Sequence, residues 1–126
     1  MLGDFVIDER GKVTFVNDFK FEGVKRFYVV ENHRPSFRGW HGHEKEAKYI
    51  FCISGAAVVG FVPLGTNQIK RYTLSVDKPK VLYIPPGHAN GFRTLTKDTK
   101  LVFFSTATLE ESKNDDIRFP EGRWPL

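Results

Sequence analysis

Residues 48–62 read KYIFCISGAAVVGFV, and their composition indicates the fold class. It contains two runs of β-branched and aromatic residues, 48–54 and 56–62, separated by Gly55. Such side chains favour the half-buried surface of a pleated sheet, and a glycine allows the chain to turn sharply. We therefore predict two strands that pair as a hairpin across Ser54 and Gly55.

Short apolar and aromatic runs recur along the rest of the chain, at 13–16, 24–31, 69–75, 81–84 and 101–106. No window shows a sustained helical period, and Pro120 and Pro125 disfavour a long helix in the tail. Many short strands separated by turns are typical of a sandwich or a barrel, and a barrel leaves few open edges. The sequence predicts an all-β, jelly-roll barrel of short antiparallel strands, with residues 1–126 forming one domain.

The composition limits the classes of partner. The net charge is +4, and the basic residues are scattered singly, which argues against nucleic acid and suits a small anionic ligand. No apolar run approaches the ~20 residues of a membrane helix, and the N-terminus lacks the pattern of a secretory signal. The single cysteine, Cys52, cannot form an intramolecular disulfide. We expect a cytoplasmic protein that binds neither membranes nor nucleic acid.

The densest chemistry lies in residues 38–43, RGWHGH. Two histidines spaced i, i+2 on an extended chain face the same side, so His41 and His43 either bind one metal or line one wall of a pocket. The metal-binding cupins resemble this chain in two motifs, H-x-H followed by Glu and Gly, and P-x-G followed by His. Here Lys48 stands at the Glu position and Asn90 at the second His position.

These two replacements predict a pocket without metal. An ammonium has no lone pair and repels a divalent ion, and an amide oxygen is a poor substitute for imidazole. Pro85, Pro86 and Gly87 end a strand, so we expect His88 and Asn90 to lie in the turn that follows. A metal-dependent cupin stays open as an alternative, with Glu46 or His88 as a further ligand.

Nearly the whole chain resembles the dTDP-4-dehydrorhamnose 3,5-epimerase family of cupins. The resemblance rests on five features of the sequence: residues 8–11 (DERG), the R-G-x-H of residues 38–41, Lys48, residues 84–92 (IPPGHANGF) and residues 123–125 (RWP). It implies an isomerase without cofactor that removes a proton beside the ketone of a nucleotide-diphospho-4-keto-6-deoxy sugar, dTDP-linked, in polysaccharide biosynthesis. It also implies a homodimer that exchanges an N-terminal strand.

The resemblance assigns roles to several residues. It makes His41 the base, Lys48 the group that stabilises the enolate oxygen, and Arg38 a contact of the phosphate or sugar. The family's acidic tyrosine falls on Phe103, which cannot donate a proton. Its aspartate, which orients the base, corresponds to either Asp115 or Asp116.

A sister branch, the sugar 3,4-ketoisomerases, shares the pattern R-G-x-H-x-H, in which the second histidine, here His43, assists proton transfer. Epimerisation and ketoisomerisation both remain open at this point, as does a sugar-nucleotide-binding cupin without activity. Asn90, Trp40 and Tyr83 are candidate substrate contacts, with packing as the alternative for the two aromatic residues. By default we expect most of the carboxylates to face solvent, among them Glu44, Glu46, Asp98, Asp115 and Asp116.

Overall fold

A computed structural model describes residues 1–126, and β-structure dominates it. Eleven strands follow one another with one short helix and one turn of 3-10 helix near the C-terminus. The strands are β1 (Asp4–Asp8), β2 (Gly11–Phe15), β3 (Arg26–Asn32), β4 (Phe37–His43), β5 (Lys48–Ser54), β6 (Ala56–Pro63), β7 (Lys70–Ser75), β8 (Val81–Ile84), β9 (His88–Thr94), β10 (Thr99–Ser105) and β11 (Ile117–Arg118). The helices are α1 (Leu109–Lys113) and η1 (Glu121–Arg123).

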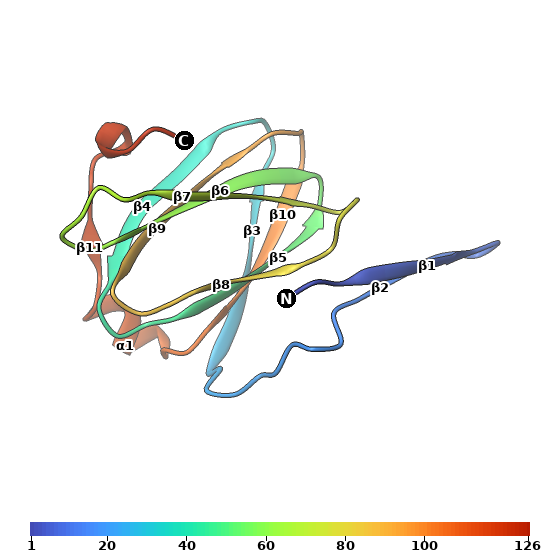
Figure 1. The fold of residues 1–126 in the computed structure, drawn as a ribbon, viewed down its shortest axis with the longest axis horizontal. Coiled ribbons are helices and arrows are strands. Elements are labelled where there is room, and N and C mark those ends of the chain that lie inside the picture. The colour runs from blue at the N-terminus through green and yellow to red at the C-terminus, as the bar shows by residue number, and fades with distance from the viewer.

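Two antiparallel sheets face each other and form the barrel (Figure 1). One has the strand order β3-β10-β5-β8, and the other has the order β11-β4-β9-β6-β7. The main core lies between them, where Ile50 and Leu101 of the first sheet belong to one apolar cluster with Val59 and Leu74 of the second. The prediction of an all-β barrel of antiparallel strands is confirmed.

The predicted hairpin of residues 48–62 is wrong, although its two strands and its turn are present. β5 pairs with β10 and β8, whereas β6 pairs with β7 and β9. Gly55, with φ of +78°, carries the chain from one sheet to the other. Each strand places one face on the common core from its own sheet, since Ile50 of β5 and Val59 of β6 belong to the same apolar cluster.

The expected turn at His88 and Asn90 is also wrong, because both residues lie in β9. This strand occupies an interior position in its sheet and pairs with β4 on one side and with β6 on the other. Two ladders of backbone hydrogen bonds therefore hold a segment whose side chains alone do not predict a strand. The tail has no long helix: α1 has five residues, and a capping box of Thr108 and Glu111 begins it.

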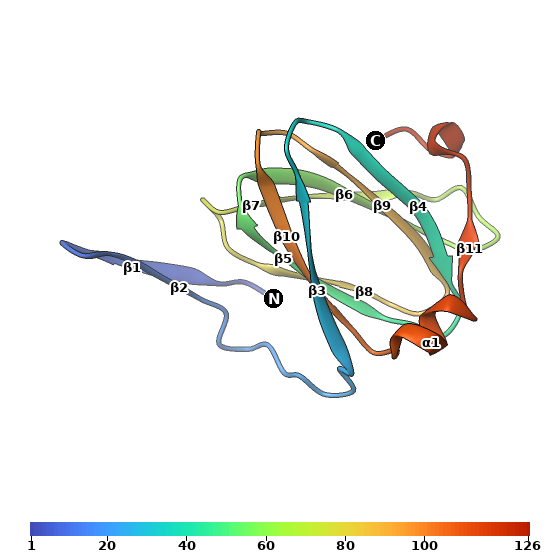
Figure 2. The same cartoon turned by 180° about the vertical axis from the view of Figure 1, so that it is seen from behind.

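The hairpin of β1 and β2 projects away from the barrel, as Figures 1 and 2 both show. The residues before it are attached to the barrel beside β8, where Gly3 N–H donates to the Pro79 carbonyl at 2.8 Å. The hairpin itself exposes Val6, Ile7 and Val13. None of the helices has the length and apolarity needed to cross a lipid bilayer.

Candidate active site

A cavity of about 230 Å³ opens between the two sheets. It combines a polar and cationic part with an apolar wall. The lining residues are Tyr28, Val30, Arg38, Gly39, His41, Lys48, Asn90, Phe92 and Phe103. Four of the seven residues predicted for the site, Arg38, His41, Lys48 and Asn90, therefore meet in one place.

A β-bulge in β4 brings Arg38 and His41 to the same cavity. Arg38 lies opposite Phe92 and His41 opposite Asn90, so the register shifts by one residue between them. Without that shift, residues three apart on a strand would point to opposite faces. Gly39 permits the close approach of the two strands, because a Cβ there would lie 2.7 Å from the Cα of Gly91.

His41 has the environment of a general base. Its Nδ1 lies 3.4 Å from Oδ1 of Asp116, and the other oxygen of that carboxylate, Oδ2, accepts a hydrogen bond from Nε of Arg118 at 3.0 Å. Because an ionised carboxylate only accepts, this contact assigns the hydrogen of a neutral ring to Nδ1 and leaves the lone pair on Nε2. Burial lowers the pKa of His41 below its ordinary value of 6.5, and Asp116 opposes that shift only in part. The imidazole is therefore neutral at neutral pH.

Asp115 has a different role from its neighbour. Its carboxylate accepts hydrogen bonds from the backbone N–H groups of Glu44, Lys45 and Glu46 at 2.8–3.0 Å, and its carbonyl accepts one from Nδ1 of His43. Burial raises the pKa of Asp115, but these backbone donors outweigh it, so the net pKa is lowered. Between the two candidates for the orienting aspartate, Asp116 is the one beside His41, and Asp115 fixes the loop between β4 and β5.

Lys48 places a cation at the wall of the cavity. The residue is 7% exposed, and its Nζ lies 3.9 Å from Oε2 of Glu46 and 5.9 Å from the centre of the Phe103 ring. Burial lowers the pKa of Lys48, and the charge of Glu46 counteracts this effect. The prediction that Glu46 faces solvent is wrong, because its side chain is fully buried.

Three other predicted site residues do not line the cavity. His43 is buried at the end of β4, where its ring contacts Asp115. Trp40 is 1% exposed and packs against Trp124 in a separate apolar cluster. Tyr83 is exposed and packs against Tyr49 with ring centres 4.9 Å apart.

Tyr28 lines the cavity but was not among the predicted site residues. It lies directly opposite Phe103 in the pairing of β3 with β10, and the two rings stack with centres 5.1 Å apart. Burial, and then the charge of Glu46, raise the pKa of Tyr28 to about 12. A phenol therefore stands one strand away from the position where the family resemblance places a tyrosine. No motif marks Tyr28, and only the pairing of β3 with β10 shows that it is the cross-strand neighbour of Phe103.

Arg38 lies at the boundary between the cavity and a second, open hollow of about 340 Å³. Its Nε donates to Oδ1 of the buried Asn32 at 2.6 Å, which fixes the direction of the guanidinium. Arg34 and His33 line the second hollow beside it. A ligand that occupies both spaces would therefore pass Arg38, and its anionic part would meet several positive or hydrogen-bonding groups.

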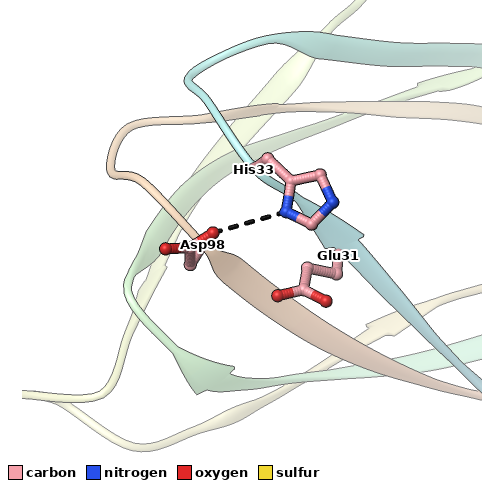
Figure 3. Close-up of side chains that lie close together, drawn as sticks. All are labelled: Glu31, His33 and Asp98. Carbon is pink, nitrogen blue, oxygen red and sulfur yellow. Dashed lines mark hydrogen bonds and ion pairs between the residues drawn. The ribbon is translucent and has the colours of Figure 1, made fainter.

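Glu31, His33 and Asp98 form a cluster of potential metal ligands at the end of β3 and the turn before β10 (Figure 3). Nδ1 of His33 lies 3.4 Å from Oδ1 of Asp98. All three residues are exposed, and Glu31 also has the ammonium of Lys100 at 3.9 Å. Because exposed acidic groups need no ion to be stable, we assign no metal to this cluster.

Two facing antiparallel sheets around one cavity, with histidine, lysine and arginine in its lining, define a cupin-type barrel with a small-molecule site. A family model described as dTDP-4-dehydrorhamnose 3,5-epimerase matches residues 6–123. The chain belongs to this family, which confirms the resemblance found in the sequence.

Individual relatives come from both branches of the resemblance. The spore coat polysaccharide biosynthesis protein SpsL of Bacillus subtilis (strain 168) is 28% identical over 89 residues, which are 66% of this chain and 59% of SpsL. The structure of ChmJ, a 3'-monoepimerase from Streptomyces bikiniensis, in complex with dTDP-quinovose, is similar with a TM-score of 0.82 and 21% identity, over 96% of this chain and 68% of that one.

The QdtA 3,4-ketoisomerase from Thermoanaerobacterium thermosaccharolyticum, a double mutant in complex with TDP, has a TM-score of 0.75 and 22% identity, over 94% of this chain and 84% of that one. At identities of 21% and 22%, the similarity to these two structures shows a common fold and no more. The fold alone therefore does not choose between epimerisation and ketoisomerisation.

Proposed function

We propose that the protein is an isomerase of nucleotide-diphospho-4-keto-6-deoxy sugars, dTDP-linked, that acts by enolisation and needs no redox cofactor. The observation that carries this proposal is the presence of a neutral imidazole, His41, and an ammonium, Lys48, in one cavity. Membership in the epimerase family and the dTDP-sugar and TDP complexes of similar structures support the choice of substrate.

The chemistry begins at the carbon next to the sugar ketone. His41 takes a proton from this carbon at Nε2, and the electron pair of the C–H bond moves onto the ketone oxygen as an enolate. The ammonium of Lys48 stabilises that oxygen in a cavity whose other walls include Phe92 and Phe103. An electrostatic contact of this kind is stronger in an apolar surrounding than in water.

Tyr28 is the proton donor in this proposal. Its pKa of about 12 keeps the phenol protonated at neutral pH. An enolate carbon is more basic than a phenolate, so transfer of the proton to carbon is favourable. The phenol thereby supplies the acid that Phe103 cannot provide.

The two hollows suggest how the substrate is divided between them. The cavity of about 230 Å³ is smaller than the roughly 300–1,000 Å³ of sites for drug-sized ligands, which suits a sugar ring rather than a whole nucleotide sugar. We place the ring there, the diphosphate beside Arg38, and the nucleoside in the open hollow beyond Arg38.

Deuterium exchange tests the proposed function. dTDP-4-keto-6-deoxyglucose is incubated with the protein in D₂O, and proton NMR follows the signals of the carbons that flank the ketone. We expect wash-in of deuterium above the background without protein, and a fall of about 100-fold or more in His41→Asn. Tyr72→Phe, an exposed tyrosine remote from the cavity, is the matched control. Wash-in at background level, or wash-in that His41→Asn leaves unchanged, would reject the proposal.

A sugar-nucleotide-binding protein without activity is the second candidate, because an apolar side chain, Phe103, stands at the expected acid position. Calorimetry distinguishes the two. Binding of the sugar nucleotide without any deuterium wash-in supports the binding protein, and wash-in excludes it.

We further propose that the protein is a homodimer in which the hairpin of β1 and β2 contacts a second copy. An isolated two-stranded hairpin is marginal in water, and this one exposes Val6, Ile7 and Val13. The edge strand β3 exposes Phe27 and Val29 on the outside of the barrel. Light scattering after gel filtration is expected to give twice the chain mass, and Ile7→Lys is expected to yield monomers.

A further inference from the structure

The carboxylate of Glu46 is buried with incomplete hydrogen bonding. Its side chain is 0% exposed, and Oε2 accepts a hydrogen bond from the hydroxyl of Ser105 at 2.9 Å. Oε1 is buried and has no hydrogen-bond partner. A buried carboxylate with an unpaired oxygen is costly unless cationic groups lie nearby, so its position requires an explanation.

Lys48, which lines the cavity, and His43, which does not, both face this carboxylate. Nζ of Lys48 lies 3.9 Å from Oε2, and Nδ1 of His43 lies 3.6 Å from Oε1. Nδ1 also contacts the carbonyl of Asp115, and because a carbonyl only accepts, Nδ1 carries a hydrogen. Both oxygens of Glu46 therefore face a positive or partly positive group.

We propose that Glu46 is a positioning residue that keeps the ammonium of Lys48 charged and fixed at the wall of the cavity. Glu46 lies two positions before Lys48, the first residue of β5, and its carboxylate is 3.9 Å from the ammonium. The carboxylate itself does not line the cavity and acts through Lys48. The catalytic consequence rests on the proposed function, whereas the electrostatic part does not.

The other charged groups around Lys48 do not replace Glu46. Arg26 of β3 disfavours the ammonium, and Asp116, before β11, favours it less than Glu46 does. His41 of β4 and Tyr28 of β3 line the same cavity as neutral groups at neutral pH. Burial, which is the largest influence, lowers the pKa of Lys48 from 10.5, so removal of Glu46 leaves the ammonium with little to offset that burial.

The charge of Lys48 can be measured on the free protein. Lysine labelled with ¹³C at Cε is titrated by NMR, and the signal missing from Lys48→Met identifies Lys48. In Glu46→Gln we expect the pKa of Lys48 to fall by about one unit or more. Glu44→Gln removes the same charge from an exposed residue of the same loop, and there we expect a change of less than about 0.3 unit, as for screened surface charges.

A second variant covers the case in which Glu46→Gln does not fold. Glu46→Asp keeps the charge but withdraws it by one methylene, and we expect a smaller fall in the pKa of Lys48. An unchanged pKa of Lys48 in folded Glu46→Gln, or in Glu46→Asp if only that variant folds, overturns the proposal.

The titration of Lys48 and the deuterium wash-in can fail independently, so the two proposals are tested separately. If the wild-type protein produces no deuterium wash-in but Glu46→Gln shifts the titration of Lys48, the enzyme assignment fails and the role of Glu46 stands. If wash-in is present, the alkaline limb of kcat/KM moves to lower pH in Glu46→Gln and not in Glu44→Gln. An alkaline limb that stays in place despite wash-in contradicts the catalytic role of Glu46.

Discussion

Replacing Asp115 with alanine removes the acceptor that fixes the loop between β4 and β5. The carboxylate accepts three backbone N–H groups, from Glu44 at 2.8 Å, Lys45 at 2.9 Å and Glu46 at 3.0 Å. Alanine leaves these donors to water where water can reach them. The same loop carries Glu46, so the change loosens a segment that supports Lys48.

The magnitude follows from the three bonds. Hydrogen bonds to a charged group contribute about 1.5–3 kcal/mol each when buried, and this carboxylate is only half-buried, so about 1 kcal/mol each and about 3 kcal/mol in total is expected. With an unfolding entropy of about 2.1 cal/mol/K per residue, a chain of this length would lose about 11 °C in Tm.

Thermal unfolding at pH 7 checks this value, with Asn114→Ala, the adjacent exposed residue, as the control, expected to change stability by less than about 0.5 kcal/mol. Because the pKa of Asp115 is lowered from 3.8 in the folded protein, its stabilisation is present above that pH and is lost as the pH falls through the folded value. The difference between wild type and Asp115→Ala should therefore narrow below pH 3.8. A difference under about 1 kcal/mol at pH 7, or one that does not narrow in acid, would refute the reasoning.

Two further predictions concern the fold and the base. Gly55→Ala places a Cβ at φ of +78°, 2.2 Å from Oγ1 of Thr96, and should destabilise the protein by about 3 kcal/mol or more in urea unfolding. The control Gly65→Ala, at φ of +83° in open space, should destabilise it by only about 1–2 kcal/mol. Equal losses of stability would contradict the crowding at Gly55. Asp116→Asn removes a charge that raises the pKa of His41, so the acidic limb of kcat/KM, already below pH 6.5, should move to lower pH. We also expect kcat to fall by about tenfold or more, because the ring loses the group that orients it. An acidic limb that moves to higher pH would exclude His41 as the base.

The apolar strands β5, β8 and β10 were predictable, whereas β4 and β9, which supply Arg38, His41 and Asn90 to the cavity, were not. β5, β8 and β10 consist largely of β-branched and aromatic residues, so their sequences alone favour strands. β4 (FRGWHGH) and β9 (HANGFRT) contain glycines for close approach and polar residues for the cavity. The local sequence pattern of a strand is therefore weakest in β4 and β9, where the residues serve the candidate site.

The error at Gly55 has a related cause. A glycine between two apolar runs predicts a sharp turn, but a turn has no information about which sheet the next strand joins. The apolar pattern of the next strand does not answer that question either, because a strand in either sheet can place one face on the common core. The turn is therefore a local property of the sequence, and the pairing is a property of the whole fold.

The site divides in the same way. Motif spacing pointed to Arg38, His41, Lys48 and Asn90, and the structure places all four in the lining of one cavity. It did not point to the proposed roles of Tyr28 and Glu46, since neither role belongs to a motif: the first depends on the pairing of Tyr28 with Phe103, and the second on the burial of Glu46 beside Lys48.

The placement of acid and base bears on the choice between the two reactions. Under the proposed function, His41 lies on β4 and Tyr28 on β3, which belong to facing sheets. A sugar ring between them would lose a proton from one face and regain it on the other, which inverts the carbon. Transfer within β4 alone, between His41 and His43, would return the proton on the same face, but His43 does not line the cavity. Epimerisation is therefore favoured over ketoisomerisation.

Tyr28→Phe should keep deuterium wash-in, because His41 still removes and returns the proton, while NMR of the product shows inversion reduced by about 100-fold or more. Inversion that survives in Tyr28→Phe would exclude Tyr28 as the donor.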